Sequence, residues 1–337
     1  MTAAKKKKIA TWIIVPLMAA IFLFDIVSVV LGNAYTARVP IADETFDGTY
    51  SDRIHFLNTA NSDAILLESN GHFALVDSGE GSHNPRRKGA YHGFEETVIA
   101  YLKKVAAGDD GKVHLDFILG THCHYDHIGS FHAILQDADI LVDTAYFKRY
   151  DSSLSRFYED GWGEKTVYEE ILADLRQRGI TLVQDLPDKP FAFGDFTVRF
   201  FNTVTPSSMR GKGENGASVG VKVTKGSRSA FLAADITRTT GLTDLLAEQV
   251  GHVDVLKLGH HGYYGSGSFA WYRALHPQIG IVTNHLGKIY PNEKWMLIFY
   301  AKLPLFATSE NDGVIVSFAD DDTLVLTRHI HERKGSS

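Results

Sequence analysis

The pattern of apolar and polar positions divides the chain into parts of different character. A largely apolar run covers residues 9–31, with Asp25 as its one charged residue and Pro16 inside it, and a polar stretch follows. Beyond it, short apolar runs alternate with polar segments, as expected for a folded domain of strands and helices. We therefore expect a membrane-directed segment at residues 1–32, a linker at 33–49, one domain at 50–330 and a polar tail at 331–337.

Short apolar runs in the domain predict strands. Ser69-Asn70-Gly71 separates two of these runs and reads as a hairpin turn, since asparagine and glycine tolerate positive φ. Residues 115–119 are continuously apolar, which is typical of a strand buried on both faces. The predicted strands are residues 53–57, 64–68, 72–76, 115–119, 191–201, 218–223, 229–233, 253–256, 278–283, 314–317 and 324–327.

Helical spacing of apolar positions occurs between these strands. The predicted helices are residues 93–105, 128–135, 167–178, 242–249, 269–275 and 292–302. Residues 143–178 form an aromatic and charged segment, which is helical only in its last part in this interpretation. Because strands and helices alternate along most of the domain, the sequence predicts an α/β fold.

The apolar run near the N-terminus is long enough to cross a bilayer, which takes about 20 residues. Four lysines, Lys5 to Lys8, precede it, and no comparable cluster follows. This asymmetry places the N-terminus in the cytoplasm and the domain outside, as a single-pass cell-membrane protein. The alternative is a signal peptide cleaved near residues 32–34, which would leave the domain secreted. Signal peptides have apolar regions of about 7–15 residues, so the length favours the anchor.

Composition narrows the classes of protein and partner. A hydrophobic fraction of 44% and a charged fraction of 22% exclude disordered and fibrous chains. Without the four lysines and Asp25, 30 basic and 39 acidic residues remain, a formal charge of −9. Such a surface argues against nucleic acid as the main partner. Cys123 is the single cysteine, so no internal disulfide can form.

Three histidines and an aspartate lie close together in the segment after the predicted strand at 115–119. In an extended stretch, His122 and His124 point to the same side and can bind one ion, while Cys123 turns away. Asp126 and His127 follow where the chain bends toward the next helix and can face a second ion. Imidazole and carboxylate are ligands of zinc, and iron and manganese accept them too. The segment therefore predicts a metal site.

This motif resembles the His-x-His-x-Asp-His hallmark of the metallo-β-lactamase superfamily. The resemblance covers about residues 53–327 and implies a four-layer αββα sandwich that holds two divalent ions, by expectation zinc. Further motifs resemble the family in the same order along the chain. They imply that Asp77 supports the metal loop, that Asp235 bridges the two ions, and that His260-His261-Gly262 supplies the last ligand.

Each of these further residues has an alternative interpretation. Asp77 precedes Ser-Gly and could be an ordinary turn residue. Asp235 could cap a helix that begins near Thr237, since aspartate is a favoured N-cap. Of His260 and His261, one is expected to bind metal and the other to contact substrate or orient a ligand. Their adjacency does not assign the two roles.

The sequence departs from the family pattern in one place. Many superfamily members carry another histidine ligand between the first motif and the bridging aspartate, but here no histidine follows His132 before that aspartate. The first ion would keep His122, His124, the bridging carboxylate and solvent, unless an oxygen of Asn215 or Ser218 contributes. We therefore expect weaker binding of the first metal.

The His-His-Gly turn resembles a branch that contains the hydrolase domain of the competence DNA-uptake protein and the phosphorylcholine esterases. This resemblance implies a phosphodiesterase that uses a water shared by two ions about 3.5–4 Å apart. Asp126 would orient that water or accept its proton, and His260 or His261 would stabilise the developing charge. The expected substrate is a small, lipid-linked or wall-linked phosphoester. A nuclease and a non-enzymatic binding module are the alternatives.

Aromatic residues are concentrated at residues 146–168, and Tyr263-Tyr264 follow the His-His-Gly turn. Such rings, Trp162 among them, could form a rim that holds a quaternary ammonium group by cation–π attraction. Alternatively, the rings pack the segment onto the sheet, which is the commoner use of aromatic side chains. His285 and Tyr290 are further candidates to line the pocket.

Overall fold

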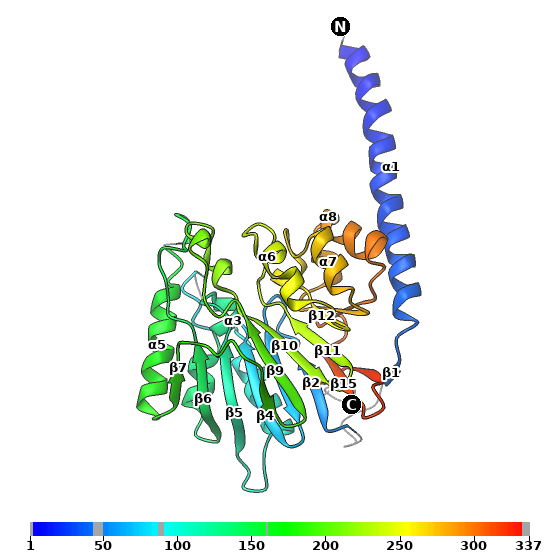
Figure 1. Cartoon of the computed structure of the whole chain (residues 1–337). Coiled ribbons are helices and arrows are strands. Elements are labelled where there is room, and N and C mark those ends of the chain that lie inside the picture. Colours follow the sequence, from blue (N-terminus) through cyan, green and yellow to red (C-terminus); the bar gives the residue numbers. More distant parts are fainter. Residues whose placement is uncertain (1–2, 43–49, 87–90, 160, 332–337) are drawn as a thin grey trace, which may run out of the picture.

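The computed structural model describes residues 3–42, 50–86, 91–159 and 161–331. Two β-sheets lie face to face, helices cover the outer face of each sheet, and one long helix projects from the domain (Figure 1). The layers thus follow the order helices, sheet, sheet, helices. The predicted αββα fold class is confirmed.

The first sheet joins both ends of the domain. Within the described residues its strands are, in spatial order, β1 (Ile41–Ala42), β16 (Leu324–Arg328), β15 (Val314–Phe318), β2 (Asp52–Phe56), β3 (Ala64–Ser69), β4 (His72–Ser78), β5 (Val113–Gly120), β6 (Ile140–Phe147) and β7 (Thr181–Val183). β2 to β4 are antiparallel neighbours, whereas β4 to β7 run parallel. Parallel strands end at the same edge, so the segments after β4 and β5 lie close together.

The second sheet has a similar mixed design. Its strands are, in spatial order, β14 (Leu305–Ala307), β13 (Ile279–Val282), β12 (Val255–Lys257), β11 (Arg228–Leu232), β10 (Gly220–Lys225), β9 (Phe196–Phe201) and β8 (Phe191–Phe193). β11 to β14 are parallel, and β8 to β11 are antiparallel. The segments after β11 and β12 therefore also leave from one edge of the sheet.

Helices cover both outer faces. The first sheet carries α2 (Glu95–Val105), α3 (Tyr125–Ile128), α4 (Phe131–Gln136) and α5 (Glu164–Gln177), and the second carries α6 (Leu242–Val250), α7 (Phe269–Leu275) and α8 (Pro291–Trp295). The helical turns are η1 (Ser207–Met209), η2 (Glu214–Ala217), η3 (Gly259–Gly262), η4 (Leu286–Lys288) and η5 (Met296–Tyr300).

The space between the sheets is filled by apolar side chains from both. Phe56 and Leu67 of the first sheet and Phe200 and Val221 of the second are fully or almost fully buried in this cluster. Burial of each such side chain contributes about 1.5–3 kcal/mol. The packed core holds the ends of the two sheets in a fixed relation, and the loops at those ends build the site.

Three predictions about individual elements were wrong. The strand predicted at residues 191–201 is a hairpin of two antiparallel strands, β8 and β9, with Gly194 at positive φ between them. Residues 143–147 belong to β6, whereas the sequence interpretation assigned them to an aromatic segment without strands. Asp143 and Thr144 interrupt the apolar run there, because only alternate side chains of this strand are buried. The predicted helix at 128–135 is divided into α3 and α4 at Gly129. A side chain at that glycine would collide with the backbone of Gly81.

The projecting helix α1 (Ala3–Thr36) contains the predicted anchor. Its stretch Trp12–Thr36 has 25 residues and a hydropathy of 2.6, so by length and composition it could cross a membrane or act as a signal sequence. The predicted linker begins inside α1, and its residues 43–49 lie outside the described part of the chain, as do residues 332–337 of the predicted tail.

Candidate metal centre

The predicted ligands come together at one end of the sandwich, from loops of both sheets. His122 and His124 follow β5, Asp126 and His127 lie on α3, Asp235 follows β11, and His260 and His261 lie on η3 after β12. In Figure 1, α3 lies at the upper end of the first sheet, close to the end of β12. The parallel pairs β4–β5 and β11–β12 thus deliver their carboxyl-end loops to a common centre.

His122, His124 and Asp235 form a first buried group, in which the potential ligand atoms lie within 4.8 Å of one another. Nε2 of His122 is 3.8 Å from Oδ2 of Asp235. The His122 and His124 rings lie side by side, with 4.7 Å between their centroids. Cys123 is buried among apolar residues instead, in agreement with the alternation expected of an extended segment.

A second group forms on the other oxygen of Asp235. Oδ1 of this carboxylate lies 3.1 Å from Nε2 of His127 and 3.4 Å from Nε2 of His261. Oδ2 of Asp126 is 3.4 Å from the same His261 nitrogen. The two oxygens of Asp235 therefore face different groups, as a bridging ligand requires. α6 begins only at Leu242, so the alternative that Asp235 caps a helix near Thr237 is wrong.

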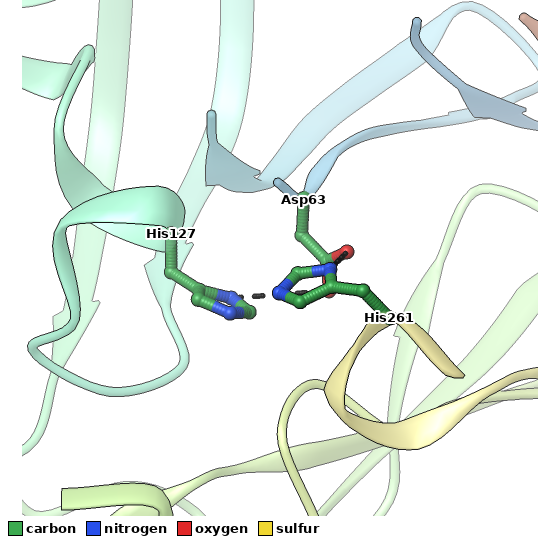
Figure 2. A group of neighbouring side chains, drawn as sticks. All are labelled: Asp63, His127 and His261. Carbon is green, nitrogen blue, oxygen red and sulfur yellow. Dashed lines mark ion pairs between the residues drawn. The ribbon is translucent and has the colours of Figure 1, made fainter. Parts of the chain in front are cut away.

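Asp63 lies behind His127 and His261, on the side of their Nδ1 atoms (Figure 2). Its oxygens are 3.2 Å from Nδ1 of His261 and 3.8 Å from Nδ1 of His127. The three residues could themselves hold a cation by spacing. However, the Asp63 carboxylate already pairs with the buried Lys257 ammonium and accepts a hydrogen bond from Thr283 Oγ1 at 2.6 Å. We interpret Asp63 as the residue that orients the two rings.

Asp77 supports the metal loop from below, in the place that the resemblance implied. Its carboxylate accepts hydrogen bonds from the backbone N–H and the hydroxyl of Thr121, both at 2.8 Å, and lies 2.7 Å from Nδ1 of His127. A carboxylate at Nδ1 fixes the proton there and leaves Nε2 free to bind a metal. Asp77 thus determines both the loop conformation and the tautomer of His127.

The backbone of the site adopts strained conformations. Asp77, Ala234, His260 and His261 have φ between 44° and 57°, which side-chain-bearing residues rarely adopt. The carbonyl of Ala234 accepts hydrogen bonds from the His260 N–H and from Lys257 Nζ, both at 2.9 Å. Such conformations persist only where surrounding contacts enforce them, and they are concentrated at functional sites.

The two histidines of η3 differ in their placement. His261 is completely buried and faces the second group, whereas the His260 side chain is 32% exposed and its Nε2 lies 3.9 Å from Oδ2 of Asp235. Nδ1 of His261 is 3.1 Å from the Thr283 hydroxyl. His261 therefore lies among the candidate ligands, and His260 lies at the rim.

The free ring nitrogens show that these residues fit a metal. Among the described residues, the Nε2 atoms of His122, His124, His127 and His261 are buried and have no hydrogen-bond partner, and neither has Oδ1 of Asp235. A buried polar atom without a partner costs about 1–3 kcal/mol. Five such atoms around two small spaces would be costly in the folded protein, and divalent ions would satisfy all of them.

The charges of the site suit cations. Burial lowers the pKa of His122 and brings that of His124 to about 4, so both rings are neutral at pH 7 and can bind metal. Burial also opposes a charge on His261, but Asp235 and Asp63 raise its pKa to about 9. Burial works against ionisation of Asp126 as well, yet His261 and His127 keep its pKa low. Without metal, a proton thus compensates the carboxylates.

Glu164, the first residue of α5, is a site residue that the sequence interpretation missed. Its Oε1 lies 3.3 Å from Nε2 of His124, is buried and accepts no hydrogen bond from the described residues. Burial, with Glu214 and Glu159 nearby, raises the pKa of Glu164 to about 9. The carboxylate lies beside the first group, where the sequence showed no third histidine. No motif in the aromatic segment pointed to it.

The other candidate oxygen ligands lie on η2 and just after it. Oδ1 of Asn215 and Oγ of Ser218 are buried and have no hydrogen-bond partner within the described part of the chain. The neighbouring Glu214 accepts a hydrogen bond from the backbone N–H of Cys123 at 3.3 Å. Glu164, by contrast, lies next to His124 of the first group.

The aromatic residues of the predicted rim have several roles. Phe147 and Tyr168 pack in the core beneath α5, as the packing interpretation proposed. Trp162 lies beside His124, with 5.7 Å between the ring centroids, and the Arg86 guanidinium lies 3.6 Å above its ring. Of the two further candidates, His285 lies at the surface near Glu310. Tyr290 is half-exposed and contacts the rings of Tyr263 and Tyr264.

Asp126 borders a polar hollow of about 280 Å³. Its lining residues are Asn61, Glu80, Asn84, Arg86, Tyr125 and Asp126. The Asp126 side chain is 26% exposed, more than the other carboxylates of the centre. Solvent and small ligands can therefore reach the second group from this side.

Several solved structures resemble the chain at low identity. They include the metallo-β-lactamase fold protein YhfI from Bacillus subtilis (14% identity, 72% of this chain and 92% of that chain, TM-score 0.45). Zn²⁺-bound PqqB from Methylobacterium extorquens shares 13% identity over 75% of this chain and 86% of that chain, with a TM-score of 0.40. CmlA, a diiron β-hydroxylase from Streptomyces venezuelae, shares 15% over 75% of this chain and 47% of that chain, with a TM-score of 0.41.

No curated protein sequence matches the chain. Residues 57–216 match the family model described as the metallo-β-lactamase superfamily. This range contains Asp63, Asp77 and the whole motif from His122 to His127. Residues 57–216 thus match the metallo-β-lactamase superfamily, and the four layers and the two groups around Asp235 agree with this match.

Proposed function

We propose that this protein is a membrane-anchored, zinc-dependent phosphodiesterase whose catalytic domain lies outside the cytoplasm. The observation that carries the proposal is the set of four buried, unpartnered imidazole nitrogens arranged around the Asp235 carboxylate. A neutral imidazole with a fixed tautomer is the zinc ligand that proteins use most readily. The superfamily consists mostly of metal-dependent hydrolases, although it also includes hydroxylases such as CmlA.

The proposed ligand sets follow from the two groups. His122, His124 and Glu164 would hold the first ion, and Asp126, His127 and His261 the second. Asp235 would contribute one oxygen to each ion. In this proposal Glu164, rather than Asn215 or Ser218, is the additional oxygen ligand of the first ion, because its free oxygen lies beside His124. With this carboxylate, the first site is more complete than the sequence alone suggested.

Two divalent ions in such a site supply a hydroxide nucleophile at neutral pH and stabilise charge on the attacked group. The side chains of the chain would do the rest. Asp126, ionised and open to the hollow, orients the attacking water and accepts its proton. His260 lies at the rim with one ring nitrogen toward the centre, where it can donate a hydrogen bond to a developing oxyanion.

Two arginines near the candidate site, Arg86 and Arg238, support an anionic substrate, although Glu80 and Asp126 also line the hollow. Arg86 lines the hollow together with Asp126, and a guanidinium binds phosphate oxygens well. Arg86 also stacks on Trp162, and Arg238 lies 4.9 Å above the ring of Tyr264. One cation of the protein thus already occupies a face of each ring, which favours a phosphate over a quaternary ammonium group at these positions.

The location outside the cytoplasm rests on the sequence. Lys5 to Lys8 precede the apolar stretch of α1, and the positive-inside tendency keeps such clusters in the cytoplasm. The domain charge of −9 outside this segment makes a long polyanion a poor substrate. We therefore rank a nuclease second and a non-enzymatic binding module third.

Metal analysis and a substrate panel test the proposal. The full-length protein, purified in detergent from metal-replete cells, should contain one to two equivalents of zinc. It should hydrolyse a chromogenic phosphodiester faster than single-stranded DNA or a β-lactam, and a chelator should abolish this activity. Absence of any transition metal would sink the proposal. Faster cleavage of single-stranded DNA would make the nuclease the leading function, and metal without hydrolysis would favour the binding module.

A further inference from the structure

One face of α1 packs on the catalytic domain. Phe24, Ser28, Leu31 and Tyr35 are at least partly buried, and their spacing of three or four residues puts them on one side of the helix. Leu31 and Tyr35 pack against the core that α6, α7 and η5 cover. The apolar residues on the other sides of the helix are exposed. The anchor is thus attached rigidly along its last third.

The contacts between α1 and the catalytic domain include Phe24 and Asp25, well before the end of the helix at Thr36. The Phe24 ring stacks on Phe299 of η5, with centroids 5.6 Å apart, and Oδ1 of Asp25 is 3.4 Å from Nζ of Lys294. An α-helix rises about 1.5 Å per residue, so Phe24 lies about 22 Å along the axis from Ile9, the first apolar residue after the lysines. The hydrocarbon core of a bilayer is about 30 Å thick.

These lengths cannot be reconciled with a domain that stands clear of the membrane. If the lysines mark the inner boundary, Phe24 lies below the outer boundary of the hydrocarbon, and any tilt of α1 places it deeper. The surface of the domain that touches Phe24 and Asp25 must then lie at the outer interface. The Asp25–Lys294 ion pair fits this position, because a charged residue at that depth needs a partner.

The domain surface at this level is aromatic. Phe269, Trp295, Phe299 and Tyr300 form what we call the aromatic ledge, and successive rings lie 4.9–6.4 Å apart. Phe269, Trp295 and Tyr300 are 41–48% exposed, which is unusual for neighbouring large rings in water. Tryptophan and tyrosine are enriched where membrane proteins cross the headgroup layer. The ledge continues directly into the stack with Phe24 on the anchor.

A groove lies between the anchor and the domain beside the ledge. It has a volume of about 630 Å³, and its lining residues are Ala20, Ile21, Phe24, Asp25, Gly287, Ile289, Pro291 and Lys294. Most of this surface is apolar, and its two charged residues, Asp25 and Lys294, form an ion pair with each other. The dimensions and the apolar lining suit an acyl chain.

The wall of this groove adjoins the metal centre. Tyr290 donates a backbone hydrogen bond to the carbonyl of Gly262 at 3.4 Å, and Ile289 packs against the same glycine. Gly262 directly follows His261 on η3. Figure 1 shows α1 projecting from the same end of the domain at which α3 lies. The groove is therefore next to η3, which carries His261.

We propose that the aromatic ledge sits in the outer headgroup layer and that the groove receives an acyl chain of a lipid whose phosphodiester headgroup is the substrate. The substrate half of this proposal rests on the phosphodiesterase function proposed above. The ledge half does not, because it depends on the geometry of α1 and the domain and on the proposed anchor, with Lys5 to Lys8 at the inner boundary. The protein would therefore act on lipids of the membrane in which it is anchored.

Fluorescence quenching tests the ledge. Full-length protein is reconstituted in vesicles of phosphatidylcholine and phosphatidylglycerol that carry bromine at a shallow or a deep position of the acyl chain. Trp295→Phe keeps an aromatic ring, so the difference between wild type and variant isolates Trp295 from the other three tryptophans. We expect the shallow label to quench Trp295 more than the deep one. Equal emission of Trp295 with and without bromine would overturn the position of the ledge.

Two pairs of variants test the lipid substrate. The readout is the rate on vesicle phosphatidylglycerol divided by the rate on a soluble chromogenic phosphodiester. A Cβ on Gly287 would meet no atom within 4 Å, so a side chain can start there; Gly287→Phe introduces a ring at the groove, and Gly287→Ala is its control. Trp295→Asp and Trp295→Phe form the second pair. We expect Gly287→Phe and Trp295→Asp to lower the ratio about tenfold, and both controls to stay within twofold of wild type.

The outcomes separate the two proposals. A wild type that cleaves the soluble phosphodiester but no vesicle lipid would overturn the lipid substrate and leave the phosphodiesterase function intact. An unchanged ratio in Gly287→Phe would overturn the groove as the acyl-chain site. If neither substrate were cleaved, the phosphodiesterase function would fail, and with it the substrate half of this proposal. The quenching experiment would still decide the ledge.

Discussion

Oε1 of Glu164 lies 3.3 Å from Nε2 of His124, and neither atom has a hydrogen-bond partner among the described residues. The two residues belong to different elements, α5 and the loop after β5. A carboxylate and an imidazole that face each other without a hydrogen bond leave a position for an ion between them. This relationship leads to the first prediction.

Glu164→Gln should weaken the first metal site without harming the fold. The pKa of Glu164 is raised to about 9 by burial, so at pH 7 the metal-free protein already carries a neutral side chain there. The variant should keep the melting temperature of the chelated protein. Its affinity for the more weakly held ion should fall by roughly 10–100-fold, measured by chelator competition. The exposed Glu170 on the same helix provides the control Glu170→Gln, which should bind metal like wild type. Equal affinities in both variants would remove Glu164 from the ligand set.

Asp235→Asn and Asp126→Ala should differ in the number of ions they lose. Asp235 offers one oxygen to each group, whereas Asp126 contacts only the second. Asp235→Asn should therefore lose most of both ions, and Asp126→Ala should keep about one equivalent while most of its activity disappears. Elemental analysis after dialysis gives the metal content, and circular dichroism checks the fold. If Asp126→Ala hydrolysed substrate at the wild-type rate, the role of Asp126 would be wrong.

Variants of the two neighbouring histidines of η3 should differ in effect: one should lose metal, and the other should lose turnover. His261 is buried among the carboxylates, while His260 is at the rim. His261→Ala should lower the metal content to about one equivalent. His260→Ala should retain the metals and lose kcat by about tenfold to a hundredfold, because only a positioned donor is removed. A reversed pattern, with metal lost in His260→Ala, would exchange the two roles.

Much of this site follows from local sequence, and the remainder does not. The spacing from His122 to His127 fixes which side chains share a side of the chain, so the motif predicts a metal site directly. Asp77 lies beside His127 and Asp235 lies between the two groups, and the supporting and bridging roles that the family resemblance implied stay predictions. Glu164 had no such signal, because α5 delivers it from a segment whose aromatic pattern indicated packing. Asp63 was also missed, because its role depends on tertiary contacts that no local motif indicates.

The distinction between His260 and His261 also lay beyond the sequence. Adjacent residues alternate sides in a strand, but both histidines adopt positive φ, and this sharp turn is what buries one and exposes the other. In the fold, regular runs such as β5 were predicted within two residues, whereas β6 was missed because its exposed side chains are polar. The spacing of apolar residues therefore predicts a strand well where nearly all its side chains are buried. It predicts a strand poorly where the tertiary structure buries some side chains and exposes others.

The metal-free protein should lose stability as the pH rises from about 6.5 to about 9. Carboxylates raise the pKa of His261 to about 9, and burial raises the pKa of Glu164 to about 9. Both side chains have a higher pKa in the folded protein than in the unfolded chain. The stability linked to their protonation is therefore fully present below the unfolded pKa, and it is lost as the pH approaches the folded pKa. Bound metal replaces the His261 proton. Melting temperatures should thus fall with pH in chelated protein and stay level in zinc-loaded protein, and parallel curves would contradict this linkage.

The orientation of the anchor can be tested in cells. Lys5 to Lys8 should hold the N-terminus inside, so that α1 crosses the bilayer once and the catalytic domain lies outside. The protein should remain in the membrane fraction after carbonate extraction. Protease added to intact cells without their outer layers should degrade the catalytic domain, while a tag placed before Lys5 stays protected. Replacing the four lysines with glutamate removes the positive charge without shortening the apolar stretch and should reduce this protection. Full-length wild-type protein in the cytosolic fraction would refute the anchor, and a shortened secreted form would identify α1 as a signal sequence.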